Sequence, residues 1–79
     1  MNQSALFDVE GVVVENLPNT YFRVKITSDT PPELNQQLLL CRMAGRMRRN
    51  FVRILPGDEV RLEVSSLDLS KGRIVYRLK

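Results

Sequence analysis

The 79-residue chain has no histidine, no tryptophan and a single cysteine. Without histidine it lacks the commonest general base and a frequent metal ligand, and it has no glycine-rich phosphate loop. Asp58-Glu59 is the one adjacent carboxylate pair, and strand neighbours point to opposite faces, so a turn role is expected instead of proton sharing. These absences predict a protein that is not an enzyme and that uses no metal and no cofactor. We expect Cys41 to be a small buried hydrophobe in a reducing compartment.

Long hydrophobic runs are also missing. No stretch approaches the ~20 apolar residues of a membrane span, and residues 1–4 have neither a basic region nor a following signal core. We therefore expect no membrane partner. The N-terminal residues are typical of a mature cytosolic protein, and they also fit a protein made inside an organelle or one whose transit peptide has been removed. A chain of this length accommodates one compact core, so residues 1–79 are predicted to form a single domain that binds on its outer surface.

Five short segments have the composition of β-strands. Apolar and polar residues alternate in residues 7–13, 21–26, 60–64 and 73–78, and residues 38–43 form an apolar run whose length favours a strand over a helix. Gly11 interrupts the first alternation, which indicates a bulge or the close approach of another segment. Turns are predicted at residues 17–20, 56–57 and 67–72. Residues 27–37, which include Pro31-Pro32, are expected to form an exposed loop.

A short helix is predicted between the third and fourth strands. Met43, Met47 and Phe51 recur every four residues, so one or two helical turns within residues 46–51 would pack all three side chains against the core. Five strands with this helical insertion indicate an all-β, five-stranded Greek-key barrel, partly open, of the oligonucleotide-binding type (OB fold). An SH3-like barrel is the main structural alternative.

Positive charge is concentrated in one part of the chain. Residues 34–57 contain five arginines and no acidic residue, a charge of +5 in a chain whose formal charge is only +3. These arginines are Arg42, Arg46, Arg48, Arg49 and Arg53. Such a segment attracts a polyanion, and guanidinium groups bind phosphate through two parallel hydrogen bonds and stack on bases. The segment therefore predicts an RNA-binding surface.

Two other interpretations of the basic segment are less favourable. A face that only aids solubility usually mixes both signs of charge, and an anionic membrane would need more exposed apolar side chains than this segment provides. The aromatic clusters of cold-shock and RRM domains are missing, although Tyr21 and Tyr76 remain candidates for base stacking. Recognition is thus expected to depend on the RNA backbone and its shape.

Three blocks of sequence resemble bacterial and plastid translation initiation factor one. They are Leu17-Pro18-Asn19, the stretch GRMRRNFVRILPGD from Gly45 to Asp58, and the stretch KGRIVYR from Lys71 to Arg77. The blocks span the chain from Leu17 to Arg77, in the order and spacing of that family.

The resemblance implies an OB-fold factor that occupies the aminoacyl-tRNA site of the small ribosomal subunit. It would contact 16S-type rRNA and a nearby ribosomal protein, block premature tRNA entry, and work as a monomer with initiation factors two and three. Its location would be the bacterial cytoplasm or the plastid stroma. The matching basic positions are Arg46, Arg48, Arg49 and Arg53 in the helix and the following loop, and Lys71, Arg73 and Arg77 in the last strand; Met47 is expected in the core.

Two features depart from the family pattern. The loop at residues 27–37 is several residues longer than usual, and Arg42 stands where many members have histidine. The arginine adds a charge to the basic surface and is compatible with a divergent or organellar member.

A general RNA chaperone of the S1 or cold-shock type is the alternative function. A protein-binding adaptor, suggested only by the long loop, is a third.

Overall fold

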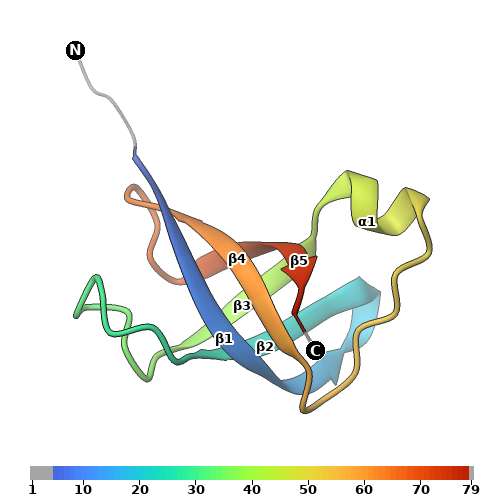
Figure 1. Ribbon diagram of the computed structural model, residues 1–79, viewed down its shortest axis with the longest axis horizontal. Coiled ribbons are helices and arrows are strands. Elements are labelled where there is room, and N and C mark those ends of the chain that lie inside the picture. Colours follow the sequence, from blue (N-terminus) through green and yellow to red (C-terminus); the bar gives the residue numbers. More distant parts are fainter. Residues whose placement is uncertain (1–4, 79) are drawn as a thin grey trace.

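Strands dominate the computed structural model, which describes residues 5–78 (Figure 1). The expectation about the N-terminal segment rests on residues 1–4, which lie outside this range. The elements are β1 (Leu6–Leu17), the 3-10 turn η1 (Pro18–Thr20), β2 (Tyr21–Ile26), β3 (Leu38–Met43), α1 (Gly45–Arg49), β4 (Glu59–Ser65) and β5 (Lys71–Arg77). None of the helices within residues 5–78 is long and apolar enough to cross a lipid bilayer.

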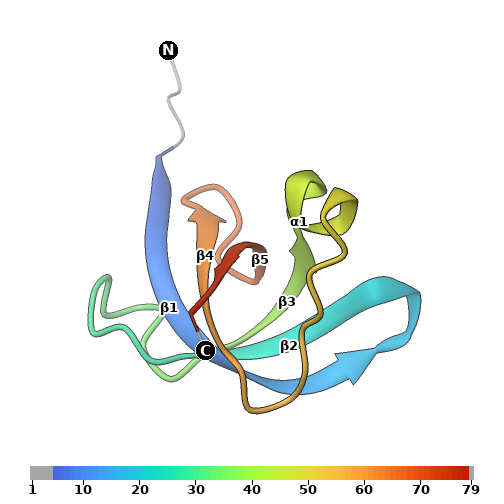
Figure 2. The same ribbon diagram turned by 45° about the vertical axis from the view of Figure 1, so that its right-hand side comes forward.

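The strands form a closed barrel in the order β1-β2-β3-β5-β4, with β4 pairing back to β1 (Figure 2). Neighbouring strands are antiparallel except β3 and β5, which are parallel and register Cys41 with Gly72. A parallel pair needs a crossover, and the chain makes it through α1 and β4 before β5 returns beside β3. The predicted five-stranded Greek-key OB barrel with a helix between the third and fourth strands is confirmed, and the barrel is closed.

The long strand β1 closes the barrel because it pairs with two neighbours. Gly11 registers with Ile26 of β2 and with Val60 of β4. A Cβ atom at Gly11 would lie 2.5 Å from the carbonyl oxygen of Lys25, so the predicted close approach is real. The bulge itself lies three residues further on, at Val14, where the register with β2 shifts. The extra residue increases the local bend that lets β1 pass from one neighbour to the other.

Alternate residues of every strand fill the barrel. The fully buried side chains include Val9, Val13, Val24, Ile26, Leu39, Cys41, Val60, Leu62, Val64 and Ile74. Cys41 is buried as expected, and desolvation raises the pKa of its thiol to about 12. A thiol with that pKa stays protonated near neutral pH and is chemically inert.

The loop at residues 27–37 is mostly exposed, as predicted, but one of its residues is buried. Leu34 is only 1% exposed and belongs to the hydrophobic core. The end of the loop is paired with the end of β2. The Ile26 amide donates to the Gln37 carbonyl, and the Gln36 amide donates to the Ile26 carbonyl. A single leucine among polar residues gives little periodicity, so the sequence pattern did not reveal this anchor.

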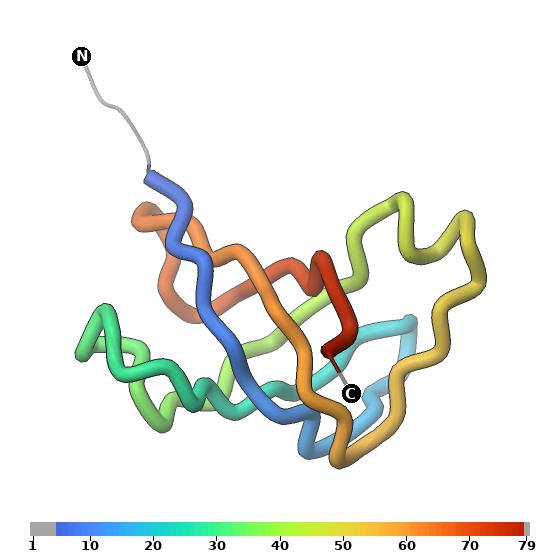
Figure 3. Tube along the Cα trace, viewed as in Figure 1, coloured from blue at the N-terminus to red at the C-terminus, as the bar shows by residue number. Residues whose placement is uncertain are grey.

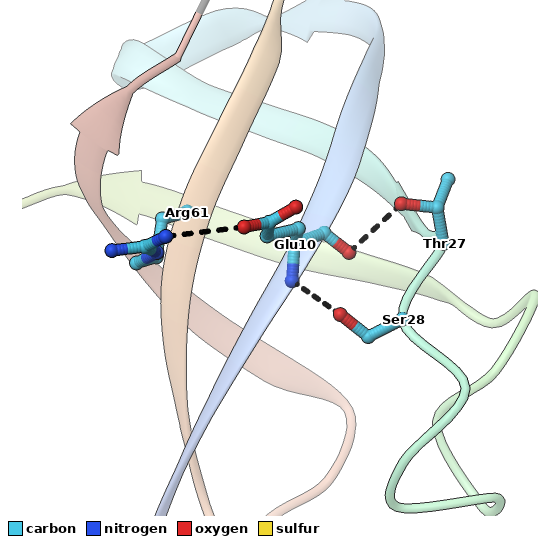
Figure 4. A network of polar contacts seen from close by, with 4 residues as sticks. All are labelled: Glu10, Thr27, Ser28 and Arg61. Carbon is cyan, nitrogen blue, oxygen red and sulfur yellow. Dashed lines mark hydrogen bonds and ion pairs between the residues drawn. The ribbon is translucent and has the colours of Figure 1, made fainter.

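Polar contacts fix the start of the same loop to β1 (Figure 4). The Glu10 amide donates to Ser28 Oγ at 2.8 Å, and Thr27 Oγ1 donates to the Glu10 carbonyl at 3.3 Å. On the other side of β1, Glu10 pairs with Arg61 of β4. These contacts attach the start of the loop to the barrel, and the loop extends from the end opposite α1 (Figure 3).

The last strand departs from the predicted alternation. Ile74 is buried, but Tyr76 is 57% exposed, whereas the sequence pattern placed both on one face. The pairing with β4 explains the difference: Leu62 registers with Ile74 and Arg61 with Tyr76, so Val75 is an extra, bulged residue. After the bulge, residues that would have faced the core are displaced toward solvent.

Candidate functional site

The short helix α1 follows the end of β3 and is attached to the barrel by the Met47 side chain and by contacts with β5. Ala44, the residue before the helix, donates its amide to the Ile74 carbonyl of β5 at 2.8 Å. Met47 is 4% exposed and packs in the core, with Met43 and Val52 against the same cluster. The prediction that Met47 belongs to the core is confirmed. With Met47 directed inward, the other side chains of the helix project outward.

The helix ends earlier than the Met/Phe pattern indicated. Asn50 caps it, Phe51 donates its amide to the Arg48 carbonyl at 3.2 Å, and Val52 donates to the Met47 carbonyl at 3.0 Å. These two bonds form a Schellman motif, with Phe51 at the left-handed position (φ 56°). Phe51 is 91% exposed, so the prediction that it packs on the core is wrong. A spacing of four residues places side chains on one face only while the helix continues, and here it has ended.

The five arginines of the basic segment are all exposed, and within residues 5–78 none of them forms an ion pair. Arg46 donates from Nη2 to the carbonyl oxygen of Val75 at 3.0 Å, which ties α1 to the bulge of β5. Arg42 lies over the ring of Tyr21, with its guanidinium carbon 5.6 Å from the ring centroid. Tyr21 and Arg42 are register partners on β2 and β3, which places the two side chains together.

The basic residues of β5 have a different environment. Arg73 Nη2 lies 2.7 Å from Glu63 Oε1, and Arg77 Nε lies 3.4 Å from Asp58 Oδ2. Asp58 also accepts the Leu55 amide at 2.9 Å, so it holds the Pro56–Gly57 turn as predicted. The charges of Arg73 and Arg77 are thus partly neutralised inside the protein, while those around α1 remain available to an external anion.

Two shallow depressions lie between α1 and β5. The larger, of about 560 Å³, is lined by Arg46, Met47, Asn50, Val52, Val75, Tyr76 and Arg77. The smaller, of about 340 Å³, has Arg46, Arg49 and Arg73 along its wall, with Glu63 among them. The structure therefore brings four of the predicted residues together on one surface. Arg42, Arg48, Arg53 and Lys71 line neither depression.

The side chains of this surface are suited to binding an anion. Its polar side chains are guanidinium groups, the phenol of Tyr76 and the amide of Asn50, with the pairing carboxylate of Glu63 at its border. Within the described residues no group of three or more His, Cys, Asp or Glu side chains could hold a metal ion. Sequence patterns did not identify Asn50 or Val75, because their position depends on the helix end and on the β5 bulge.

The family model described as translation initiation factor 1A / IF-1 matches residues 3–79. The chloroplastic translation initiation factor IF-1 of Dioscorea elephantipes is 51% identical over 70 residues, which cover 89% of this chain and 82% of the relative. Among solved structures, translation initiation factor IF-1 from the Wolbachia endosymbiont strain TRS of Brugia malayi superposes with a TM-score of 0.71 and 42% identity, over 94% of this chain and 79% of that one.

A more distant structural neighbour shares the fold alone. YjeQ from Thermotoga maritima has a TM-score of 0.65 and 23% identity, and the match covers 92% of this chain but 23% of YjeQ. The barrel is therefore an architecture that also occurs as one part of a larger protein.

Proposed function

The chain belongs to the translation initiation factor 1A / IF-1 family, whose members are initiation factors and not enzymes, and on this premise we propose that it binds the small ribosomal subunit at the aminoacyl-tRNA site. Bound there, it blocks premature entry of tRNA and supports assembly of the initiation complex with initiation factors two and three. It acts as a monomer, in the bacterial cytoplasm or the plastid stroma.

One observation carries the proposal: the arginines around α1, and Arg42 on the adjacent strand, have no carboxylate partner within residues 5–78, whereas the other four arginines of the barrel wall do. Arg23 pairs with Glu15 and Arg61 with Glu10, so the protein neutralises arginine charge elsewhere. An unpaired cluster repels itself and costs folding stability. A polyanionic partner restores that stability on binding, because phosphates supply the missing negative charge.

The geometry favours folded RNA over a free strand. A-form RNA displays phosphates and 2′-hydroxyls across a wide, shallow minor groove, which suits guanidinium groups on a rigid support. In this proposal Arg46, Arg48, Arg49 and Arg53 contact ribosomal RNA, and Arg42 adds a contact from the adjacent strand. Lys71, Arg73 and Arg77 contribute from β5, where Arg73 and Arg77 share their charge with Glu63 and Asp58.

Chemical footprinting on purified bacterial small subunits tests the proposal. We expect saturating protein to protect decoding-site bases and to prevent an elongator tRNA from binding there. Arg49→Glu should weaken binding about 10- to 100-fold, because it removes a charge-assisted contact and opposes the phosphates.

Lys25→Glu is the matched control. The substitution makes the same change in charge as Arg49→Glu. Lys25 is exposed, and within residues 5–78 it forms no ion pair. It registers with Leu38 at the start of β3, whereas α1 follows the other end of that strand, about 16 Å away at ~3.3 Å per residue. We expect it to bind nearly as tightly as wild type.

Three outcomes would reject the proposal. Equal losses for Arg49→Glu and Lys25→Glu would show that only net charge matters. Equal affinity for an unstructured single-stranded oligonucleotide, without protection of the decoding site, would favour a general RNA chaperone. Binding that does not change with salt would instead indicate a protein-binding adaptor.

A further inference from the structure

Phe51 combines an unfavourable backbone conformation with almost complete exposure. Its φ is 56°, in the left-handed region that a bulky side chain rarely adopts, and 91% of the residue is accessible to solvent. Among the large apolar side chains exposed in residues 5–78, it has the highest exposed fraction. The next highest is Leu67, at 75%.

The fold does not need a phenyl group at this position. Phe51 occupies the residue of the Schellman motif at which glycine is preferred, because glycine has no Cβ to clash in the left-handed conformation. The two hydrogen bonds of the motif use the backbone amides of Phe51 and Val52. The apolar contact that accompanies such a motif is supplied by Val52, which packs with Met47 against the core. Glycine at position 51 would keep all of these interactions.

The surroundings of Phe51 indicate which partner would cover the ring. Arg48, Arg49 and Arg53 flank it along the chain, all of them exposed and none of them ion-paired within residues 5–78. An apolar protein surface would have to bury those charges, which is costly without matching carboxylates. RNA satisfies both requirements, because phosphates bind the guanidinium groups and the face of a base covers the ring.

We propose that Phe51 is an RNA-contacting residue whose ring stacks on a nucleobase, while the neighbouring arginines bind the phosphates around it. The Schellman motif fixes the backbone that carries the ring, so little backbone entropy is lost on binding. The inference rests on the proposed function, since ribosomal RNA is the partner that brings the base.

Four variants at one position separate stacking from folding and from general hydrophobic contact. Phe51→Gly and Phe51→Leu should each bind small subunits about 10- to 100-fold more weakly, because stacking on an aromatic ring is lost. Phe51→Trp and Phe51→Tyr, which retain a stacking face, should bind within about threefold of wild type. Thermal unfolding should give Phe51→Gly a midpoint equal to or above that of wild type, because the left-handed position suits glycine.

The salt dependence of binding adds a second criterion. Phe51→Gly removes no charge, so the slope of log K against log [salt] should not change, while Arg49→Gln should reduce that slope by about one.

Failure of this inference and failure of the proposed function give different results. If Arg49→Glu binds weakly but Phe51→Leu binds as tightly as wild type, the ring does not stack on a base and this inference is rejected, while the proposed function stands. A loss of thermal stability in Phe51→Gly equal to its loss of binding would also reject it, because the ring would then be structural. If the wild-type protein protects no ribosomal RNA, the proposed function itself fails.

Discussion

Truncation of Leu34 should destabilise the whole barrel, although the residue lies in an inserted loop. Leu34 is 1% exposed and belongs to the hydrophobic core. Hydrogen bonds hold the loop backbone to the end of β2, so it cannot collapse to fill the space that Leu34→Ala leaves. A buried Leu→Ala change of this kind costs about 2–5 kcal/mol. A domain of this size has a free energy of unfolding of roughly 4–12 kcal/mol.

Urea denaturation followed by far-UV circular dichroism measures the effect. With a slope of about 1–1.5 kcal/mol per molar urea, a loss of about 3 kcal/mol lowers the midpoint by roughly 2–3 M. Leu67→Ala is the matched control, because it is the same change in another loop at a residue 75% exposed, and it should alter stability by less than about 0.5 kcal/mol. If the two variants lose equal stability, or if Leu34→Ala loses less than about 1 kcal/mol, then Leu34 does not anchor the loop to the core.

Other predictions concern backbone crowding, a buried thiol and charge. Gly11→Ala should destabilise the protein by about 3 kcal/mol or more in the same urea assay, because the new Cβ would lie 2.5 Å from the Lys25 carbonyl oxygen. Gly57 has a φ of 93°, but no atom lies within 4 Å of the position of a Cβ there, so Gly57→Ala should cost only about 1 kcal/mol. Burial raises the pKa of Cys41 from 9.0 to about 12, so the unfolded thiol ionises above pH 9 while the folded one does not. Between pH 8 and pH 10 the unfolding free energy of the wild type should therefore fall by about 1.4 kcal/mol more than that of Cys41→Val. Equal losses would show that burial does not raise the pKa of this thiol. Arg49→Gln should lower the salt dependence of subunit binding by about one unit of slope, and an unchanged slope would place that guanidinium away from phosphate.

Strand periodicity was sufficient to predict the barrel. Phe22, Val24 and Ile26 alternate with polar residues and are buried, and the same holds for Val60, Leu62 and Val64. This pattern is readable because one face of each strand touches a single common core. Gly11 was also informative, since a glycine inside a strand marks a site where other backbone comes close.

The features missed by the sequence pattern depend on single residues and on tertiary contacts. The bulge at Val75 turns Tyr76 outward, and the pairing of β5 with β4 that creates it has no local signal. The end of α1 at Arg49 leaves Phe51 exposed, although its spacing from Met47 suggested otherwise. The composition was sufficient to predict the concentration of positive charge in the basic surface. It could not predict the ion pairs, because Glu63 meets Arg73 and Asp58 meets Arg77 only in the folded barrel.

The parallel pairing of β3 with β5 also determines when the basic surface is assembled during folding. All five arginines of the central segment precede β4 and β5 in the chain, but α1 is fixed by contacts from the last strand, where Ile74 accepts the Ala44 amide and Val75 accepts Arg46. Contacts between residues so far apart in sequence form late and slowly. A chain in which β5 has not yet paired therefore carries the full charge of the segment on a helix that lacks both of these contacts. The arginines are therefore oriented only after β5 has paired with β3.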